Sequence, residues 1–145
     1  MAKTQFKFFD YTDKTLSKMA KAQGVAVTKG CLMAEDAVKS QITSQGLVDT
    51  GALRASVTHS VKTDGKKSMG KFGSNLDYAI YQEYGTGQFA ENGGGRKGGW
   101  AYTGRDGKRH FTYGTKPKKF FRTAVKKSAS NISTAVTSEF RSQLS

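Results

Sequence analysis

The chain has 145 residues, of which 36% are hydrophobic, and a formal net charge of +13. This length is sufficient for one domain with one modest hydrophobic core. The single cysteine, Cys31, excludes an internal disulfide, and no apolar run approaches the roughly 18 residues that a membrane-spanning helix needs. The first residues lack the apolar segment of a signal peptide, so we expect a cytoplasmic product without a membrane anchor.

The positive charge is concentrated in one segment. Residues 1–92 contain 12 basic and 9 acidic residues, a net charge of +3, whereas residues 93–127 contain 11 basic residues and one acidic residue, Asp106. This segment therefore has a net charge of +10. It favours contact with a polyanion or with an acidic protein surface. The alternative interpretation is a solvated basic loop that aids solubility.

A long amphipathic helix is predicted near the N-terminus. It follows Phe6, Phe8 and Phe9, whose alternation fits either a strand or a packed arm, and three candidate caps: Asp10, Thr12 and Asp13. Apolar residues then recur in steps near 3.6 residues: Leu16, Ala20, Val27, Cys31, Ala34, Val38 and Ile42. Gly24 and Gly30 lie within this pattern and indicate a bend or close packing against a neighbour.

A second, short helix and a hairpin come next. Asp49 or Thr50 caps a short helix that carries Leu53. Residues 57–62 alternate between apolar and polar side chains, which predicts a half-buried strand, and Asp64-Gly65 is a turn signal. A returning strand is expected at about residues 69–74, with Phe72 facing inward. Its two glycines, Gly70 and Gly73, indicate a bulge or an irregular edge.

Residues 76–87 form a tyrosine-rich segment. Tyr78, Tyr81 and Tyr84 recur three residues apart, which places them near one face of a short helix. Gly85 and Gly87 supply the end of this helix and a permissive backbone after it. No nucleophile or acid–base pair accompanies the tyrosines, so we interpret the segment as a docking element.

Residues 88–114 are predicted to form a flexible, projecting, glycine-rich arm. Aromatic residues at positions 100, 102, 111 and 113 flank a turn at residues 105–108, which predicts a second hairpin. The tip is both aromatic and basic. We expect it to contact a neighbouring protein or DNA through Arg96, Lys97, Trp100, Tyr102, Arg105, Lys108, Arg109 and Phe111.

A C-terminal helix ends the chain, and Pro117 suits its first turn. Its apolar residues recur in steps of three or four: Phe121, Val125, Ala129, Ile132, Val136, Phe140 and Leu144. The expected fold is a single α+β domain over residues 1–145. Its long N-terminal and C-terminal helices pack on a small antiparallel sheet, from which the arm projects.

Catalytic and metal-binding patterns are absent from the sequence. His59 lies on a strand face and His110 lies among basic residues, and neither has a ligand-spaced neighbour. Asp77 and Glu83 are six residues apart and do not share a helix face, so Glu83 is expected to pair with a basic residue. The glycine-rich stretches lack the spacing of a phosphate loop. We expect no enzyme, no metal and no cofactor.

Three blocks of the sequence resemble one family. They are VDTGALRAS at residues 48–56, YAIYQEYGTG at residues 78–87 and KPKKFFRTA at residues 116–124. They resemble the blocks (V)DTGxLRxS, YAxxxExGT and PxPFLRPA of the tail-component family of long, non-contractile-tailed phages. That family includes neck, tail-completion and head–tail joining proteins. The third block departs from the pattern at Lys118, Lys119 and Thr123, and the insert before it is long and rich in glycine.

The resemblance implies a structural virion protein, made in the host cytoplasm and placed at the head–tail interface. It implies a homo-oligomeric ring of sixfold or twelvefold symmetry between the capsid connector and the tail tube. Its neighbours would be head-completion and tail-terminator or tail-tube proteins, with DNA in the lumen as a further, non-specific contact. Core or ring docking is assigned to Asp49, Thr50, Gly51, Leu53, Arg54, Tyr78, Tyr81, Glu83, Tyr84, Gly85, Phe120 and Phe121.

Two other hypotheses stay open. One is a tail terminator, which caps the growing tail and fixes its length. The other, from a different class, is a sequence-independent nucleic-acid-binding protein, in which aromatic side chains of the arm stack on bases while its cations contact phosphates.

Overall fold

The computed structural model describes residues 10–47 and 51–145. Its elements are the helices α1 (Thr12–Ser44), α2 (Ala52–Ser56), α3 (Asp77–Tyr84) and α4 (Phe120–Leu144), the 3₁₀ helix η1 (Gly87–Phe89), and the strands β1 (Val57–Thr63), β2 (Ser68–Ser74), β3 (Trp100–Thr103) and β4 (Arg109–Thr112). The predicted α+β class is confirmed. The predictions for Phe6, Phe8, Phe9, Asp49 and Thr50 lie outside the described residues.

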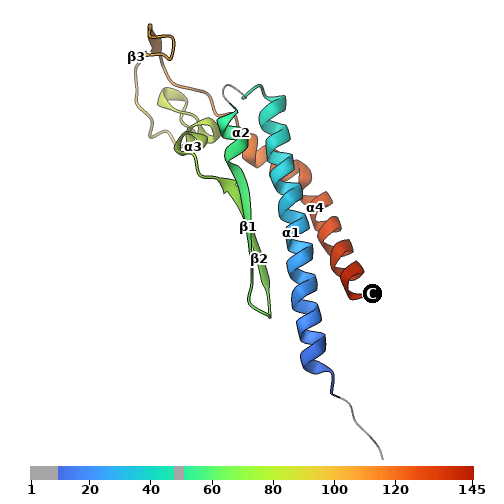
Figure 1. Cartoon of the computed structure of the whole chain (residues 1–145). Coiled ribbons are helices and arrows are strands. Elements are labelled where there is room, and N and C mark those ends of the chain that lie inside the picture. The colour runs from blue at the N-terminus through green and yellow to red at the C-terminus, as the bar shows by residue number, and fades with distance from the viewer. Residues whose placement is uncertain (1–9, 48–50) are drawn as a thin grey trace, which may run out of the picture.

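Helix α1 packs against α4, α2 and both strands of the β1–β2 hairpin (Figure 1). The β1–β2 hairpin lies along one side of α1, and α4 runs back along another side of it. Helices α2 and α3 lie near the C-terminal end of α1, and the β3–β4 hairpin lies beyond α3 at the same end of the molecule. The two hairpins form separate two-stranded sheets.

Helices α1 and α4 meet along ridges of residues spaced four apart. The α1 ridge is buried and consists mainly of small residues: Ala22, Ala26, Gly30, Ala34, Val38 and Ile42. Such i, i+4 rows are one of the two kinds of ridge through which helices interlock. The prediction was wrong at the start of α1, where Leu16 is 54% exposed. In α4, Phe120 and Ala124 are buried, and Phe121 and Val125 of the predicted stripe are half-buried.

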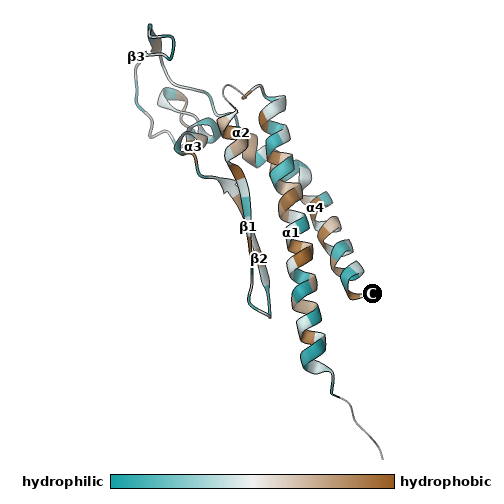
Figure 2. Cartoon of the chain, viewed as in Figure 1, coloured by the Kyte–Doolittle hydropathy of each residue, from teal (hydrophilic) through white to brown (hydrophobic). Residues whose placement is uncertain are grey.

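Gly30 explains why the helices approach closely at this ridge. A β-carbon added to it would lie 2.6 Å from the Cγ2 atom of Val136 and 3.5 Å from the Cγ2 atom of Ile132. The close packing predicted from this glycine is therefore confirmed. Apolar and polar residues alternate along α1 in Figure 2, as an amphipathic helix requires.

The β1–β2 hairpin is regular. Its register runs without interruption from Val57 opposite Ser74 to Thr63 opposite Ser68, so the expected bulge or irregular edge is absent. Gly70 has a different role: a β-carbon there would lie 2.2 Å from the Sγ atom of Cys31. The glycine lets β2 approach α1 closely. Cys31 is buried at this contact, as predicted, and burial raises the pKa of its thiol.

The main core lies where α1, α2, β1, α3 and α4 converge. Its buried members are Val38, Ile42, Leu53, Val57, Ala79, Phe120 and Ala124. Phe72 of β2 stacks on Phe121 of α4 beside this cluster, with ring centroids 5.4 Å apart. Burial of each large apolar side chain contributes about 1.5–3 kcal/mol. Through Ala79, this core fixes the position of the short helix α3.

The start of α4 differs from the prediction. Pro117 precedes the helix by three residues instead of lying in its first turn, because the chain before Phe120 is held against α3. The amide of Lys118 donates to the carbonyl of Gln82 at 2.8 Å, and the amide of Lys119 donates to the carbonyl of Glu83 at 3.3 Å. Helix α4 therefore begins at Phe120, directly after these two hydrogen-bonded residues.

Candidate assembly surface

Helix α3 presents aromatic side chains to solvent. Tyr78, Ile80, Tyr81 and Tyr84 are between 40% and 62% exposed, and we call these four residues the α3 aromatic surface. The opposite side of the helix is buried through Ala79 and Glu83. The predicted tyrosine face is thus directed outward, and Ile80, which the sequence analysis did not single out, is its most exposed member.

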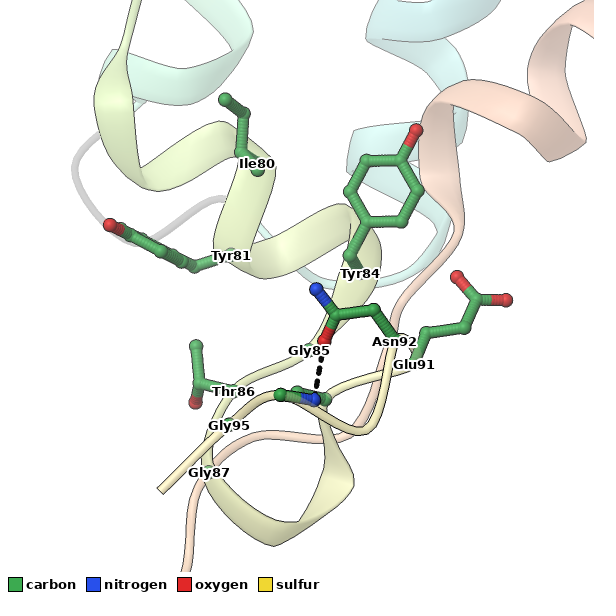
Figure 3. A pocket seen from close by; sticks show the side chains of 11 residues that line it. Ile80, Tyr81, Tyr84, Gly85, Thr86, Gly87, Glu91, Asn92 and Gly95 are labelled. Atoms are coloured by element: carbon green, nitrogen blue, oxygen red, sulfur yellow. Dashed lines mark hydrogen bonds between the residues drawn. The ribbon is translucent and has the colours of Figure 1, made fainter.

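A hollow of about 490 Å³ lies beside the α3 aromatic surface (Figure 3). Ile80, Tyr81 and Tyr84 line one side of it, and residues 85–87, 90–92, 94 and 95 line the rest. The side chain of Asn92 shapes the loop by accepting a hydrogen bond from the amide of Gly94 at 2.9 Å, drawn in Figure 3. The surface therefore combines exposed aromatic side chains with a recess large enough for several side chains of a partner.

Glu83 connects α3 to the N-terminus of α4. It is 6% exposed, and its Oε2 atom accepts a hydrogen bond from the amide of Phe121 at 2.8 Å. Its Oε1 atom accepts from the amide of Arg122 at 3.2 Å and from the Nε atom of the same residue at 2.8 Å. A carboxylate at this position satisfies amides that the helix itself leaves unpaired and opposes the positive end of the helix dipole.

Arg122 extends this contact to the loop after α3. Its Nη1 and Nη2 atoms donate to the two carboxylate oxygens of Glu91 at 2.9 and 2.7 Å, and its guanidinium lies 4.9 Å from the centroid of the Tyr84 ring. The guanidinium holds the pKa of Glu91 below its ordinary value, and the two carboxylates raise the pKa of Arg122. Glu91 and Arg122 therefore stay charged around neutral pH, and their contacts hold the α3 aromatic surface in place.

The ends of residues 88–114 are closely joined. The amide of Thr86 donates to the carbonyl of Thr115 at 2.8 Å, and the amide of Gln88 donates to the carbonyl of Tyr113 at 3.1 Å. Gly87 permits this crossing: a β-carbon there would lie 2.2 Å from the Tyr113 carbonyl oxygen. The predicted second hairpin is confirmed. That the whole segment forms a flexible, projecting arm stays a prediction.

The other predicted docking residues lie in or near the core. Leu53 and Phe120 are buried, and Phe121 is half-buried. Gly51 precedes α2 with a left-handed φ of 78°, which suits a glycine, and Arg54 donates to the hydroxyl of Thr43 at 3.2 Å. Gly85 ends α3 in a positive-φ conformation.

The residues predicted to make arm contacts lie on or next to the β3–β4 hairpin. Arg96 lies 5.5 Å from the centroid of the Trp100 ring, and Tyr102 stacks on His110 at 5.5 Å. Asp106 pairs with His110 at 3.0 Å, and this contact holds the pKa of Asp106 below its ordinary value. The remaining predicted residues are exposed: Lys97, Arg105, Lys108, Arg109 and Phe111.

Sequence reasoning expected a basic partner for Glu83 but did not identify it. Arg122 lies 39 residues away in the chain, and Glu91, the other carboxylate of the network, falls in the glycine-rich insert. The available signal was that Glu83 and Arg122 both occupy charged positions of the two family-like blocks at residues 78–87 and 116–124.

The described part of the chain, residues 10–47 and 51–145, contains no group of three or more His, Cys, Asp or Glu side chains arranged to hold a metal ion. None of the helices within these residues is long and apolar enough to span a membrane.

Comparison with known proteins agrees with the sequence blocks. No curated protein and no solved structure matches the chain. The family model described as "Bacteriophage HK97-gp10, putative tail-component" matches residues 6–85, which is more than half of the chain. The match includes the block at residues 48–56 and most of the block at residues 78–87. This family points to a structural component of the virion instead of an enzyme. The chain therefore belongs to the HK97-gp10-like family of phage tail components.

Proposed function

We propose that this protein is a neck or tail-completion protein that joins the phage head to its tail. It would form a ring of sixfold or twelvefold symmetry between the capsid connector and the tail tube. Its partners in the ring are copies of itself, and its partners above and below are head-completion and tail-terminator or tail-tube proteins.

The α3 aromatic surface is the observation that carries this proposal. Ile80 and the three tyrosines lie on one short helix and remain exposed in the isolated chain, and Ile80, Tyr81 and Tyr84 line an open hollow. Contiguous exposed aromatic and aliphatic side chains mark protein–protein interfaces, where aromatic residues are enriched. The Glu83–Arg122–Glu91 network holds this surface in one conformation, so less ordering entropy is lost when a partner binds.

A ring also needs two different surfaces on each subunit. In a cyclic ring the contact is head-to-tail, so a surface on one subunit meets a different surface on the next. The α3 aromatic surface would supply one side of such a contact. The hollow beside it, lined partly by the same residues, would receive side chains from the neighbour.

The first test is electron microscopy of a lysate from a phage whose gene for this protein carries an early stop codon. DNA-filled heads beside separate tails of normal length are the expected result. Tails longer than normal would identify a tail terminator instead. Intact, infectious particles would overturn both assignments.

A second test places the function on α3. Ile80→Ser is expected to abolish ring formation and head–tail joining while leaving the melting temperature nearly unchanged, because the side chain is 62% exposed. Leu32→Ser is the matched control, since it removes an exposed aliphatic side chain (48% exposed) from α1. Native mass spectrometry at equal protein concentrations measures the assembly. Equal assembly by the two variants would contradict the assignment of the surface.

A further inference from the structure

The positive charge near the β3–β4 hairpin is largely uncompensated. Arg96, Lys97, Lys108 and Arg109 are exposed, and none of them pairs with an acidic residue of the described chain. The one acidic residue of the hairpin, Asp106, is already bound to His110. This end of the molecule therefore presents four cations to whatever lies against it.

A second copy of the chain is a poor partner for these cations. Seven of the ten acidic residues that the structure describes already accept hydrogen bonds or ion pairs within the chain: Asp10, Glu35, Asp64, Glu83, Glu91, Asp106 and Glu139. Few carboxylates remain for a contact between copies, and like charges brought together would repel. The partner of the hairpin must bring its own negative charge.

The shape of the hairpin narrows the class of partner. It is an isolated two-stranded ribbon with four residues in each strand, about 13 Å long. In the register, Arg109 pairs with Thr103 and Phe111 pairs with Ala101. All four side chains therefore lie on one face of the ribbon, where the two large side chains of β4 neighbour two small ones of β3. A two-stranded β-ribbon is one of the elements that the major groove of B-form DNA, which is about 12 Å wide, accepts.

We propose that the β3–β4 hairpin binds double-stranded DNA through its phosphates, without sequence preference, using Arg96, Lys97, Lys108 and Arg109. The biological role of this DNA contact rests on the proposed neck function, because a ring at the neck surrounds the path of the DNA. The hairpin lies at one end of the molecule, beyond α3 (Figure 1), so it reaches DNA without displacing the core.

Counterion release sets the expected salt dependence. Four phosphate contacts per subunit give a slope of log K against log salt concentration of about −3.6. Removing two of these contacts reduces the size of the slope by about 1.8. If the affinity extrapolated to 1 M salt is unchanged, the affinity at about 0.1 M salt becomes roughly 60-fold weaker.

The experiment measures fluorescence polarisation of a labelled 20-base-pair duplex, titrated with the full chain over a series of salt concentrations. The test variant is Lys108→Gln/Arg109→Gln. The matched control is Lys66→Gln/Lys67→Gln, which removes the same charge from the turn of the other hairpin, β1–β2. Circular dichroism verifies that both variants are folded. The proposal requires the large loss of affinity in the first variant and binding close to wild type in the second.

Three outcomes would overturn the proposal. The first is no polarisation change at low salt, and the second is an equal loss in both variants, which would indicate net charge alone. The third is stronger binding to polyglutamate than to a duplex of equal charge, which would indicate an acidic protein partner. Because binding is measured on the isolated protein, and joining on phage particles, failure of the DNA contact and failure of the neck function are distinguishable.

Discussion

Removal of the Glu83 carboxylate is expected to loosen the junction between α3 and α4. The buried carboxylate accepts hydrogen bonds from two amides at the start of α4 and from the Arg122 side chain. Loss of a helix-capping acceptor costs about 1 kcal/mol, and loss of a hydrogen bond between charged groups costs about 1.5–3 kcal/mol. We therefore expect Glu83→Ala to lower the free energy of unfolding by about 3 kcal/mol.

This loss translates into a measurable change in melting temperature. With an unfolding entropy of about 2.1 cal/mol/K per residue, a chain of 145 residues should lose about 10 °C. Glu83→Gln keeps one acceptor oxygen but loses the charge, so it should fall between wild type and Glu83→Ala. Thermal unfolding followed by circular dichroism gives these values, at one protein concentration for all variants, because assembly itself raises the apparent stability.

Glu139→Ala is the control for this experiment. Glu139 also connects two helices, through an ion pair with Lys29 at 3.0 Å, but this pair lies at the surface. Surface ion pairs contribute little to stability, so the control should melt close to wild type. Equal melting temperatures for Glu83→Ala and Glu139→Ala would refute the argument that burial and helix capping make Glu83 important.

Two further predictions concern residues of α1, one its packing against α4 and the other the pH dependence of stability. Gly30→Ala should lower the free energy of unfolding, because overpacking against Val136 costs about 1–3 kcal/mol and exceeds the roughly 1 kcal/mol gain in helix propensity. Val136→Ala in the same chain should recover part of the loss in urea unfolding, and a Gly30→Ala variant more stable than wild type would contradict the close contact. Hydrogen bonds from Lys39 and His59 hold the pKa of Glu35 below its ordinary value of 4.5. The ionised carboxylate therefore stabilises the fold above pH 4.5, and this contribution is lost as the pH falls through the lowered pKa. The urea midpoint should therefore fall on acidification below about pH 4.5, and Glu35→Gln should flatten this dependence; an unchanged profile would exclude the contribution.

The secondary structure followed from the sequence where a local signal was strong. Alternation at residues 57–62, the Asp64-Gly65 turn and the aromatic pairs around residues 105–108 were sufficient for both hairpins. The long apolar periodicities were sufficient for α1 and α4. These features depend on neighbouring residues, whose spacing is visible in one dimension.

The errors lie where two segments distant in the chain meet. The sequence indicated an average helical period, but the contact of Gly30 with Val136 brings α4 against a row of α1 residues spaced four apart. Leu16, which belonged to the predicted stripe, lies off this row and is exposed. Gly70 looked like the site of a bulge, yet it makes room for Cys31 in a regular hairpin. Neither outcome could be read from local spacing, because each depends on which side chain arrives from the other element.

The sequence by itself determined the α+β class, the family-like blocks, the position of the positive charge and the three tyrosines spaced along one face of a short helix. Only the tertiary structure decided that those tyrosines are exposed and that Glu83, on the same helix, is buried as a cap for α4. The physical reason is that exposure depends on the partner of the opposite helix face. Here that partner includes Arg122, which lies 39 residues further along the chain and is brought to Glu83 by the folding of α4 against α1.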